Sequence, residues 1–394
     1  MKTATPAAIN PLVQDVGTPP IPEAQGWLAR YDGAHGPAMN LSQAVPGSAP
    51  HPLMLERLAE SAGSAAAARY GAIDGDEELR RAYAAEMSAI YEGRIEARDT
   101  AVTAGCNLAF FATMMLLARH GDAVLLPAPW YFNHEMSLDM LGIEARPLPC
   151  RAETGFVPRV EDAEALIDGK VKAIVLVTPN NPTGAVYPDH VVDAFAALCR
   201  DKGIYLVIDE TYRDFLPNEM NRAHGLFVDD SWRQTVIQLY SFSKSYAIPG
   251  HRTGAITADS ALIAQVSKVL DCIQICPPRT AQAVLPWAID NLRSWREENR
   301  HNINHRAQVF RQALTPLPGW RIESAGAYFA YLTHPFAGRS AQQVAEKLAT
   351  ERGVLVLPGS YFGPGQERQL RVAFANVGAD VLIGLTKRLR GFSV

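Results

Sequence analysis

The chain has 394 residues, of which 48% are apolar and 20% are charged. This composition is typical of a folded enzyme with two or three domains and excludes an intrinsically disordered chain. Lysine and arginine together number 37 against 41 aspartate and glutamate residues, so the net charge of −4 gives no support for a nucleic acid or an acidic membrane as a partner.

The N-terminal stretch MKTATPAAINPLVQDVGTPP carries prolines where a signal peptide would need an apolar run. No stretch of the chain approaches the roughly 20 apolar residues that span a bilayer. We therefore expect a cytoplasmic protein with no membrane or nucleic-acid partner. The cysteines show neither a CxxC pair nor a zinc spacing, which predicts reduced thiols and no metal site. They are Cys106, Cys150, Cys199, Cys272 and Cys276.

Short apolar runs alternate with longer helical patterns from about residue 100 onward. Residues 172–178 (KAIVLVT) and 204–209 (IYLVID) are dense in valine and isoleucine, as are strands that are buried on both faces. Between them, residues 188–203 have the pattern of a helix that ends at a glycine. Further strands are expected at 235–240 and 254–258. This alternation predicts a largely parallel sheet with helices on both faces.

The pattern changes after about residue 285. A charged helical stretch covers residues 291–314 and leads into an apolar stretch at 320–332. There follow a helix from Ser340, the apolar strand GVLVL at 353–357, the strand QLRVAFA at 369–375 and a last helix. This order predicts a smaller α+β domain.

Polar residues directly follow three of the predicted strands. PNNPTG follows IVLVT, Asp209 ends IYLVID, and SFSK with Lys244 follows TVIQLY. Ligands of open α/β sheets bind beyond these carboxyl ends of the strands. A buried aspartate needs a cation. Lys244 could supply it in an ordinary salt bridge, but a ligand cation held near both residues explains the arrangement better.

A second group of residues is suited to bind a phosphate. A turn at Ala104–Gly105 opens a helix at Cys106, and the amides at the start of a helix bind anions. Ser241 and Arg252 add a hydroxyl and a permanent positive charge. Together with Asp209, these residues predict a ligand with a phosphate at one end and a protonatable ring nitrogen at the other.

The chain contains, in this order, the motifs TAGCNLA, APWYFNH, TPNNPTGAVY, DETY, SFSKSYAIPGHRTG and LRVAFA. With them, the chain from about residue 40 to its end resembles the class I/II aminotransferases, pyridoxal-phosphate enzymes of fold type I. The resemblance implies an α/β fold, with a mostly parallel mixed sheet flanked by helices in a large domain, and a small α+β domain. It places a segment that contributes to the small domain and to an active-site lid at residues 1–45, the large cofactor-binding domain at 46–285 and the small domain at 286–394.

The resemblance also implies a reaction. An L-amino acid would give its amino group to a 2-oxo acid through Schiff-base and quinonoid intermediates on pyridoxal 5′-phosphate. Lys244 would bond to the aldehyde carbon of the cofactor, and the freed amine would then move a proton. Asp209 would keep the pyridine nitrogen protonated, so that the ring accepts electrons from Cα. His134 matches a histidine that contacts this aspartate.

Other residues match positions that hold the cofactor. Asn181, which precedes an expected cis Pro182, and Tyr212 match hydrogen-bond partners of the ring oxygen O3′. Tyr131 matches an aromatic residue that stacks on the ring. Tyr70 matches a tyrosine that, in the family, reaches the cofactor phosphate of the other subunit. Each active site would then receive Tyr70 of the partner subunit, which implies a homodimer with shared active sites. The remaining phosphate positions are matched by Gly105, Cys106, Asn107, Ser241 and Arg252.

Arg371 matches the arginine that grips the substrate α-carboxylate with two parallel hydrogen bonds. Asn181 and the backbone near Ala44 would assist it, although the stretch LSQAVPG around Ala44 departs from the glycine- and acid-containing pattern of relatives.

Asp271 lies, counting back from Pro277–Pro278, where dicarboxylate-specific members carry an arginine. An acid in that place favours basic or neutral amino acids as substrates. Two alternatives stay open: Asp271 on a solvated helix face would select nothing, and Arg279 pointing inward would favour acidic substrates.

The same site chemistry leaves other functions open. Members of the fold also catalyse elimination at C–S bonds or ring closure. A transcription regulator with an aminotransferase-like sensor domain would need a helix-turn-helix ahead of it, and the first 40 residues are too short and too rich in proline for one. A structural protein with a degenerate site conflicts with the presence of Lys244, Asp209, Arg252 and Arg371.

Overall fold

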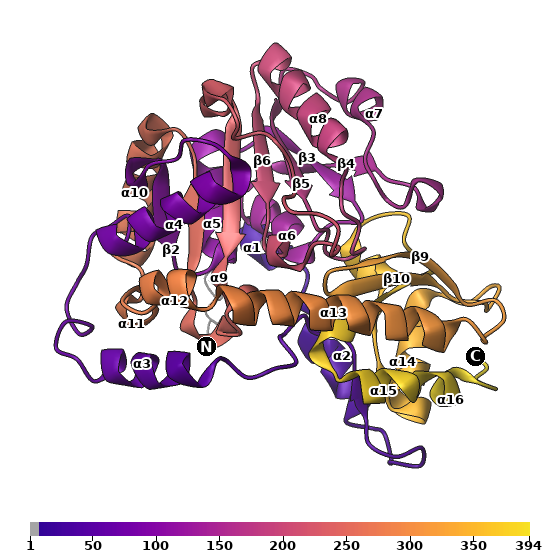
Figure 1. The fold of residues 1–394 in the computed structure, drawn as a ribbon. Coiled ribbons are helices and arrows are strands. Elements are labelled where there is room, and N and C mark those ends of the chain that lie inside the picture. Colours follow the sequence, from indigo (N-terminus) through magenta and orange to yellow (C-terminus); the bar gives the residue numbers. More distant parts are fainter. Residues whose placement is uncertain (1–7) are drawn as a thin grey trace, which may run out of the picture.

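A seven-stranded sheet forms the centre of the larger part of the computed structural model, which describes residues 8–394 (Figure 1). Residues 1–7 of the expected N-terminal segment 1–45 lie outside the described residues. The strands of the sheet are β2 (Thr100–Thr103), β3 (Ala123–Ala128), β4 (Glu144–Pro149), β5 (Val171–Val177), β6 (Tyr205–Asp209), β7 (Val236–Ser241) and β8 (Gly254–Thr257). Their order is β2-β8-β7-β6-β5-β3-β4. β8 is antiparallel to both of its neighbours and the other pairs are parallel, so the sheet is mixed and mostly parallel.

Helices cover both faces of this sheet because side chains alternate along its buried strands. The helices of this part are α3 (Pro52–Ala62), α4 (Glu77–Tyr91), α5 (Cys106–Leu117), α6 (Phe132–Leu141), α7 (Val160–Glu164), α8 (Asp189–Lys202), α10 (Ser260–Gln274), α11 (Arg279–Gln282) and α12 (Leu285–Asn291). In β5, Ile174 and Leu176 belong to a hydrophobic core that α4, α8 and α12 complete. Ala173 and Val175 belong to a second core, with α5, α6 and α10. The sheet therefore carries a helical layer on each face, as predicted.

Helix α8 occupies the stretch in which the sequence predicts a helix between two buried strands. It ends at Lys202, and Gly203 caps it in the left-handed region at φ 65°. Glycine adopts this conformation without a Cβ clash. Val192, Phe195 and Cys199, at helical spacing, are fully buried and bind the helix to the sheet.

A long helix, α13 (Arg293–Leu314), connects the large sheet to a smaller antiparallel sheet (Figure 1). The smaller sheet has the order β12-β13-β10-β9, with β9 (Arg321–Gly326), β10 (Phe329–Thr333), β12 (Leu357–Pro358) and β13 (Gln369–Val372). A third hydrophobic core packs it against α13 and four other helices. These are α2 (Pro20–Leu28), α14 (Ala341–Arg352), α15 (Ala379–Ile383) and α16 (Leu385–Leu389). This is the α+β architecture that the sequence predicts after about residue 285.

The apolar run GVLVL forms two short strands, so the prediction of a single strand was wrong. β11 (Val354–Leu355) pairs in parallel with β1 (Met39–Asn40), whereas β12 pairs with β13. The chain passes from one sheet to the other at Val356. The pairing with β1 brings the N-terminal segment beside β13, where the amide of Ala373 donates to the carbonyl of Leu41 at 2.8 Å.

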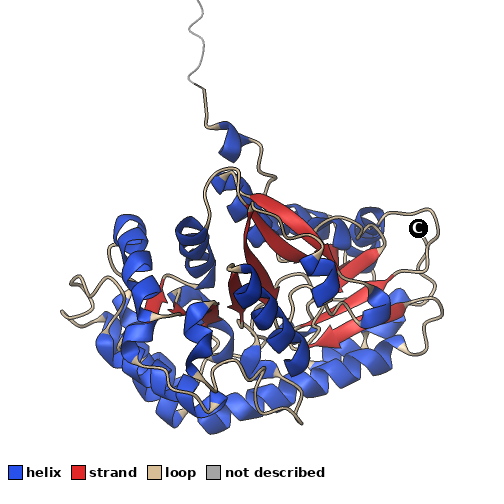
Figure 2. Ribbon diagram, turned by 90° about the horizontal axis from the view of Figure 1, so that it is seen from above, coloured by secondary structure: helices blue, strands red, loops and turns tan. Residues whose placement is uncertain are grey.

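Seen from above, helices enclose the strands of both sheets (Figure 2). The short helix α1 (Pro11–Gln14) lies against α6, so the start of the described chain contacts the larger part of the molecule. None of the described helices is long and apolar enough to cross a membrane.

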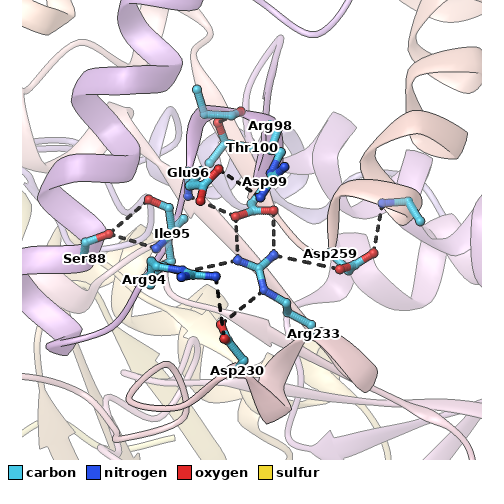
Figure 3. A network of polar contacts seen from close by, with 12 residues as sticks. Ser88, Arg94, Ile95, Glu96, Arg98, Asp99, Thr100, Asp230, Arg233 and Asp259 are labelled. Carbon is cyan, nitrogen blue, oxygen red and sulfur yellow. Dashed lines mark hydrogen bonds and ion pairs between the residues drawn. The ribbon is translucent and has the colours of Figure 1, made fainter.

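Arg233 joins three segments through a network of ion pairs (Figure 3). It precedes Val236, the first residue of β7, and so lies at the end of this strand opposite to Ser241. Its Nη1 and Nη2 donate to the two carboxylate oxygens of Asp99 at 2.6 and 2.9 Å, and Asp99 is fully buried. Asp230 lies 3.4 Å away and Asp259, which caps α10, lies 3.8 Å away. This bidentate pair ties the starts of β2 and β7 to α10 without touching the cavity described below.

Candidate active site

A cavity of about 460 Å³ opens where the carboxyl ends of β6 and β7 meet the start of α5. Its wall is completed by β13 of the small sheet and by residues 43–45 of the N-terminal segment. The predicted site residues that line this cavity are Ala44, Cys106, Asn107, Tyr131, Asn181, Asp209, Tyr212, Ser241, Lys244, Arg252 and Arg371.

Lys244 reaches the cavity from α9 (Phe242–Ser245), a short helix that Ser241 caps. Burial, followed by the positive charges of Arg252 and Arg371, lowers the pKa of Lys244 to about 8. An amine with a lowered pKa has a larger neutral fraction near neutral pH, which makes it a better base and a better nucleophile.

Asp209 ends β6 and is 5% exposed. Its Oδ1 accepts a hydrogen bond from the amide of Thr211 at 2.9 Å and lies 3.8 Å from Sγ of Cys106. Its Oδ2 lies 3.4 Å from Nε2 of His134, whose ring stacks on Phe110. No lysine or arginine of residues 8–394 forms an ion pair with it. The ordinary salt bridge with a lysine is therefore not formed in this part of the chain, and the carboxylate is free for a cationic ligand.

The first turn of α5 forms a cradle of backbone amides. Gly105, its N-cap residue, has φ 91°, and a Cβ there would lie 2.1 Å from Nη2 of Arg252. A Cβ at Gly254 would lie 2.8 Å from the amide nitrogen of Cys106. The two glycines let the guanidinium and β8 approach the start of the helix closely. With the hydroxyl of Ser241 beside them, these groups suit a phosphate.

Arg371 of β13 is 2% exposed and lies between the rings of Phe329 and Phe362, 5.0 and 4.8 Å from their centres. Its Nη1 donates to Oδ1 of Asn181 at 2.9 Å, and its Nη2 donates to the carbonyl of Ser42. Its buried Nε has no partner among the described residues. Burial lowers the pKa of Arg371 to about 10. A buried cation that meets only neutral acceptors is suited to bind a carboxylate.

Tyr131 precedes α6 and Tyr212 follows β6. Burial raises the pKa of both phenols, and the neighbouring Tyr131 raises that of Tyr212 further. Each hydroxyl therefore keeps its proton and can donate a hydrogen bond into the cavity. The peptide bond between Asn181 and Pro182 is cis.

The cysteines are unpaired, and one of them borders the cavity. Burial, followed by the charge of Asp209, raises the pKa of Cys106, so its thiol stays protonated. No group of three or more His, Cys, Asp and Glu side chains within residues 8–394 is placed to hold a metal ion.

Four predicted site residues do not line the cavity of their own chain. Gly105 and His134 lie directly behind the lining, next to Cys106 and 3.4 Å from Asp209, whereas Tyr70 and Asp271 lie on the surface. Tyr70 is 78% exposed, and Asp271 lies on the exposed side of α10. Arg279 pairs with Asp76 at 3.1 Å and donates to the carbonyl of Ala66 at 2.8 Å, so its guanidinium is already engaged away from the cavity.

The cavity also contains residues that the sequence analysis missed. Ser243 and Phe132 are next to recognised motif residues, so proximity to those motifs could have indicated them. Pro19 and Ile21 belong to no motif, and only the folding of the N-terminal segment over the cavity brings them there. The missed residues are Pro19, Ile21, Gln43, Val45, Phe132, Asn133, Val177, Thr211, Ser243 and Pro249.

The family described as aminotransferase class I and II has a sequence model that matches residues 37–389. The chain therefore belongs to the class I and II aminotransferases, which confirms the resemblance found from its motifs. It is 28% identical over 360 residues to an aromatic aminotransferase of Arabidopsis thaliana, with 89% of each chain covered. It is also 28% identical over 321 residues to an arginine–pyruvate transaminase of Pseudomonas aeruginosa, with 81% of each chain covered. An aspartate aminotransferase of Sulfolobus acidocaldarius is 27% identical, with 78% of each chain covered.

Solved structures share the fold. A double mutant of the Thermus thermophilus aspartate aminotransferase superposes with a TM-score of 0.89 at 24% identity, covering 97% of this chain and 98% of the other. Substrate-bound BacF from Bacillus subtilis gives 0.89 at 23% identity, with 98% of both chains covered. The predicted fold class, an α/β fold of type I, is thereby confirmed. These three sequence relatives are named as aminotransferases or transaminases, but their names carry different amino acids.

Enzymes of this family and fold depend on pyridoxal phosphate, and the cavity residues fit that group. The glycines bring the guanidinium of Arg252 close to the backbone amides at the start of α5, and this combination of donors suits a phosphate. Asp209 offers a buried carboxylate without a lysine or arginine partner in the described chain, which suits a protonated ring nitrogen. Lys244 offers an amine of lowered pKa in the same cavity.

Proposed function

We propose that this protein is a pyridoxal-phosphate-dependent aminotransferase that transfers the amino group of a neutral L-amino acid to a 2-oxo acid. One observation carries the proposal: Lys244, Asp209 and the buried cation Arg371 line a single cavity beside an anion cradle. Membership of the family and the names of the three relatives support the same reaction.

The cofactor would be held by its phosphate and by its ring. When bound, it supplies an aldehyde carbon that combines with amines and a protonated ring that withdraws electrons from the substrate Cα. The residues that would bind the phosphate are Gly105, Cys106, Asn107, Ser241 and Arg252, and those that would hold the ring are Tyr131, Asn181, Asp209 and Tyr212.

Lys244 would act as the base of the reaction. Its Nζ would take the proton from the substrate Cα, and its lowered pKa of about 8 makes the neutral amine available near physiological pH. Asp209 would hold a proton on the ring nitrogen through its negative charge. His134, 3.4 Å from Asp209, would keep the carboxylate in this orientation.

Arg371 would bind the α-carboxylate of the substrate. A charged acceptor binds a guanidinium more strongly than a neutral carbonyl does, so the carboxylate would replace the Ser42 carbonyl on Nη2. It would also give the unpartnered Nε an acceptor. Asn181 already contacts Nη1 and would stay beside the carboxylate, and the backbone at Ala44 would cover it.

The lining of the cavity supports a substrate with a neutral side chain. The charged side chains of the described lining are those of Asp209, Lys244, Arg252 and Arg371, and each has a role given above. A charged substrate side chain would therefore lose its hydration without gaining a counter-ion. The remaining side chains at the N-terminal segment and α6 are apolar or carry amides: Pro19, Ile21, Gln43, Val45, Phe132 and Asn133.

We also propose that the protein is a homodimer with shared active sites. The large apolar side chains of Tyr70, Ile73 and Ile275 are exposed. They belong to two segments that are in contact, because the amide of Gly71 donates a hydrogen bond to Sγ of Cys276 at 3.4 Å. Exposed apolar side chains gathered in this way are typical of protein interfaces. In such a dimer Tyr70 of one subunit would reach the phosphate in the site of the other. Asp271 is not part of the lining from which we infer a neutral substrate, and a kcat/KM for arginine above that of every neutral donor would point to Asp271 instead.

Absorbance of the purified protein tests the proposed reaction. After incubation with pyridoxal phosphate and gel filtration, we expect a visible band of protein-bound cofactor. A neutral amino donor should remove this band, and a 2-oxo acid should restore it. Comparing kcat/KM for phenylalanine, leucine, glutamine, arginine and aspartate tests the substrate class. A higher kcat/KM for aspartate or arginine than for every neutral donor would contradict the neutral preference.

The elimination and ring-forming alternatives give a different result in the same experiment. A C–S lyase would release pyruvate and ammonia from cysteine conjugates without loss of the cofactor band. That outcome would replace transamination by elimination, and a protein that retains no cofactor after gel filtration would overturn the proposal as a whole.

A further inference from the structure

A buried chain of polar contacts connects the residue beside Lys244 to the long helix α13. The hydroxyl of Tyr240 donates to Oδ2 of Asp214 at 2.7 Å, and Ser245 Oγ lies 2.7 Å from the same hydroxyl. Because the single proton of Tyr240 goes to the carboxylate, the Ser245 hydroxyl must donate to the Tyr240 oxygen. Arg296 of α13 completes the chain by donating from Nη1 to Oδ1 of Asp214 at 3.2 Å.

The chain continues from α13 to α4. Arg296 also donates from Nη2 to Oε1 of Glu86 on α4, and the guanidinium of Arg213 lies 4.0 Å over the ring of Tyr240. Tyr240, Glu86 and Arg296 are 0%, 4% and 9% exposed. Burial, followed by the charge of Asp214, raises the pKa of Tyr240, so its hydroxyl keeps the proton that the chain requires.

Charges buried in this way do little for net stability, since their desolvation offsets most of the attraction between them. Such pairs can instead favour one arrangement of the surrounding segments over others. Helix α9, which carries Lys244, is a single four-residue turn, so neighbouring contacts must fix the direction of its side chains. One such contact is the hydrogen bond between Ser245 and Tyr240, and Ser245 is the residue that directly follows Lys244 in the sequence.

We propose that Tyr240, Asp214 and Arg296 are positioning residues that hold Lys244 in its place in the cavity. Asp214 follows Tyr212 by two residues, so the chain of contacts ties Lys244 to the segment that ends β6. The helix of Arg296 packs against that segment and, farther along, against β9 and the turn after β13, the strand of Arg371. The amine and the carboxylate-binding cation are thus fixed to one helix.

Two tyrosine-to-phenylalanine variants test this role with the same chemical change. Tyr240→Phe removes only the hydroxyl that links Ser245 to Asp214. Tyr246→Phe is the matched control, because Tyr246 is also fully buried, two residues after Lys244, and lies under the guanidinium of Arg296 at 5.2 Å. Its hydroxyl has no hydrogen-bond partner among the described residues.

The first readout needs neither cofactor nor turnover. The pH dependence of acetylation of Lys244, followed by mass spectrometry of its peptide in the cofactor-free protein, gives the pKa of the amine. The groups facing this amine are Asp209, Cys106, Arg252 and Arg371. We expect Tyr240→Phe to let the amine reach water and to raise its pKa toward the ordinary value, while Tyr246→Phe leaves it unchanged.

The second readout rests on the proposed function. With the holoenzyme, we expect Tyr240→Phe to lower kcat about tenfold or more, with KM within about twofold of the parent, since the substrate-binding groups stay in place while the base is misplaced. Tyr246→Phe should keep both constants. A failure of transamination altogether would leave the acetylation result standing, so the two proposals fail separately.

The proposal is overturned if Tyr240→Phe and Tyr246→Phe give the same pKa of Lys244. Should Tyr240→Phe lose its circular-dichroism signal, Asp214→Asn replaces it. That variant keeps the side-chain shape but turns one acceptor facing Arg296 or Tyr240 into a donor, and it should shift the same pKa upward. An unchanged pKa in a folded Asp214→Asn protein overturns the proposal equally.

Discussion

Lys244 donates a hydrogen bond from Nζ to the backbone carbonyl of Ala44 at 2.5 Å, although the two residues are 200 positions apart in the sequence. Two residues earlier, the carbonyl of Ser42 accepts from Arg371. The N-terminal segment therefore contributes one backbone acceptor to each of the two cations that we assign to catalysis and substrate binding. Cofactor and substrate must displace these two carbonyls, so we expect residues 42–45 to move when the site is filled.

The pH dependence of turnover should follow Lys244. In the cofactor-free cavity its pKa is lowered to about 8, and only the neutral amine can take a proton. We therefore expect kcat, which reports the substrate complex in which this amine is free, to rise with pH and to level off above that value. Arg252→Met removes one of the charges that lower the pKa, and it should move the inflection to higher pH. A profile that is flat from about pH 7 to pH 9 would argue against Lys244 as the base.

Asp209→Asn should lower kcat about 100-fold or more, because the amide cannot hold a proton on the ring nitrogen by charge. The free energy of unfolding should change by no more than about 1 kcal/mol, since Asn keeps an oxygen for the amide of Thr211. Stopped-flow absorbance and urea titration measure the two effects. Asp193→Asn, at an exposed position of α8, is the control and should alter neither. A kcat that falls only in proportion to lost folding would contradict the assigned role.

Local sequence signals predicted the floor of the site. The end of α8 at Gly203 and the polar residues after β6 and β7 follow from rules that act within a few residues. Apart from Tyr205 at the start of β6, the residues of both strands are buried. The spacing of Lys244 and Arg252 is likewise local, so the motif places both in one cavity.

The mouth of the cavity could not be predicted in the same way. Pro19 and Ile21 reach it through the packing of α2, and the contacts of Ser42 depend on the pairing of β1 with β11. Such contacts depend on non-local pairings that no window of sequence contains. The same reason explains why GVLVL was wrongly predicted as one strand: its four consecutive apolar residues can be buried in either sheet, and tertiary contacts divide the run at Val356.

Arg371→Lys should raise KM for the amino donor about 100-fold, which corresponds to about 2.7 kcal/mol, because an ammonium cannot form the two parallel bonds of a guanidinium. Affinity for pyridoxal phosphate should stay within about twofold, since the cradle at Gly105 is untouched. Arg368→Lys, at an exposed neighbour whose guanidinium donates to the carbonyl of His334, is the matched control. Equal KM values for the two variants would remove Arg371 from the substrate site.

Arg233→Met should lower the free energy of unfolding by about 3 kcal/mol, because it leaves the fully buried Asp99 without its bidentate partner. Urea denaturation monitored by fluorescence measures the change. Arg98→Met breaks an exposed pair with Glu96 and should cost less than about 1 kcal/mol. Because the network in Figure 3 lies at the end of the sheet away from the cavity, cofactor affinity at low temperature should be preserved in both variants. Equal stability of the two variants would show that the buried pair contributes nothing.

The most direct measurement is the mass of the peptide that contains Lys244 after the protein has been incubated with pyridoxal phosphate and reduced with borohydride. We expect that this peptide alone carries the reduced cofactor and that Lys244→Ala abolishes the label while phosphate contacts still retain some free cofactor. A label on another lysine, or none in a folded protein saturated with the cofactor, would contradict this expectation.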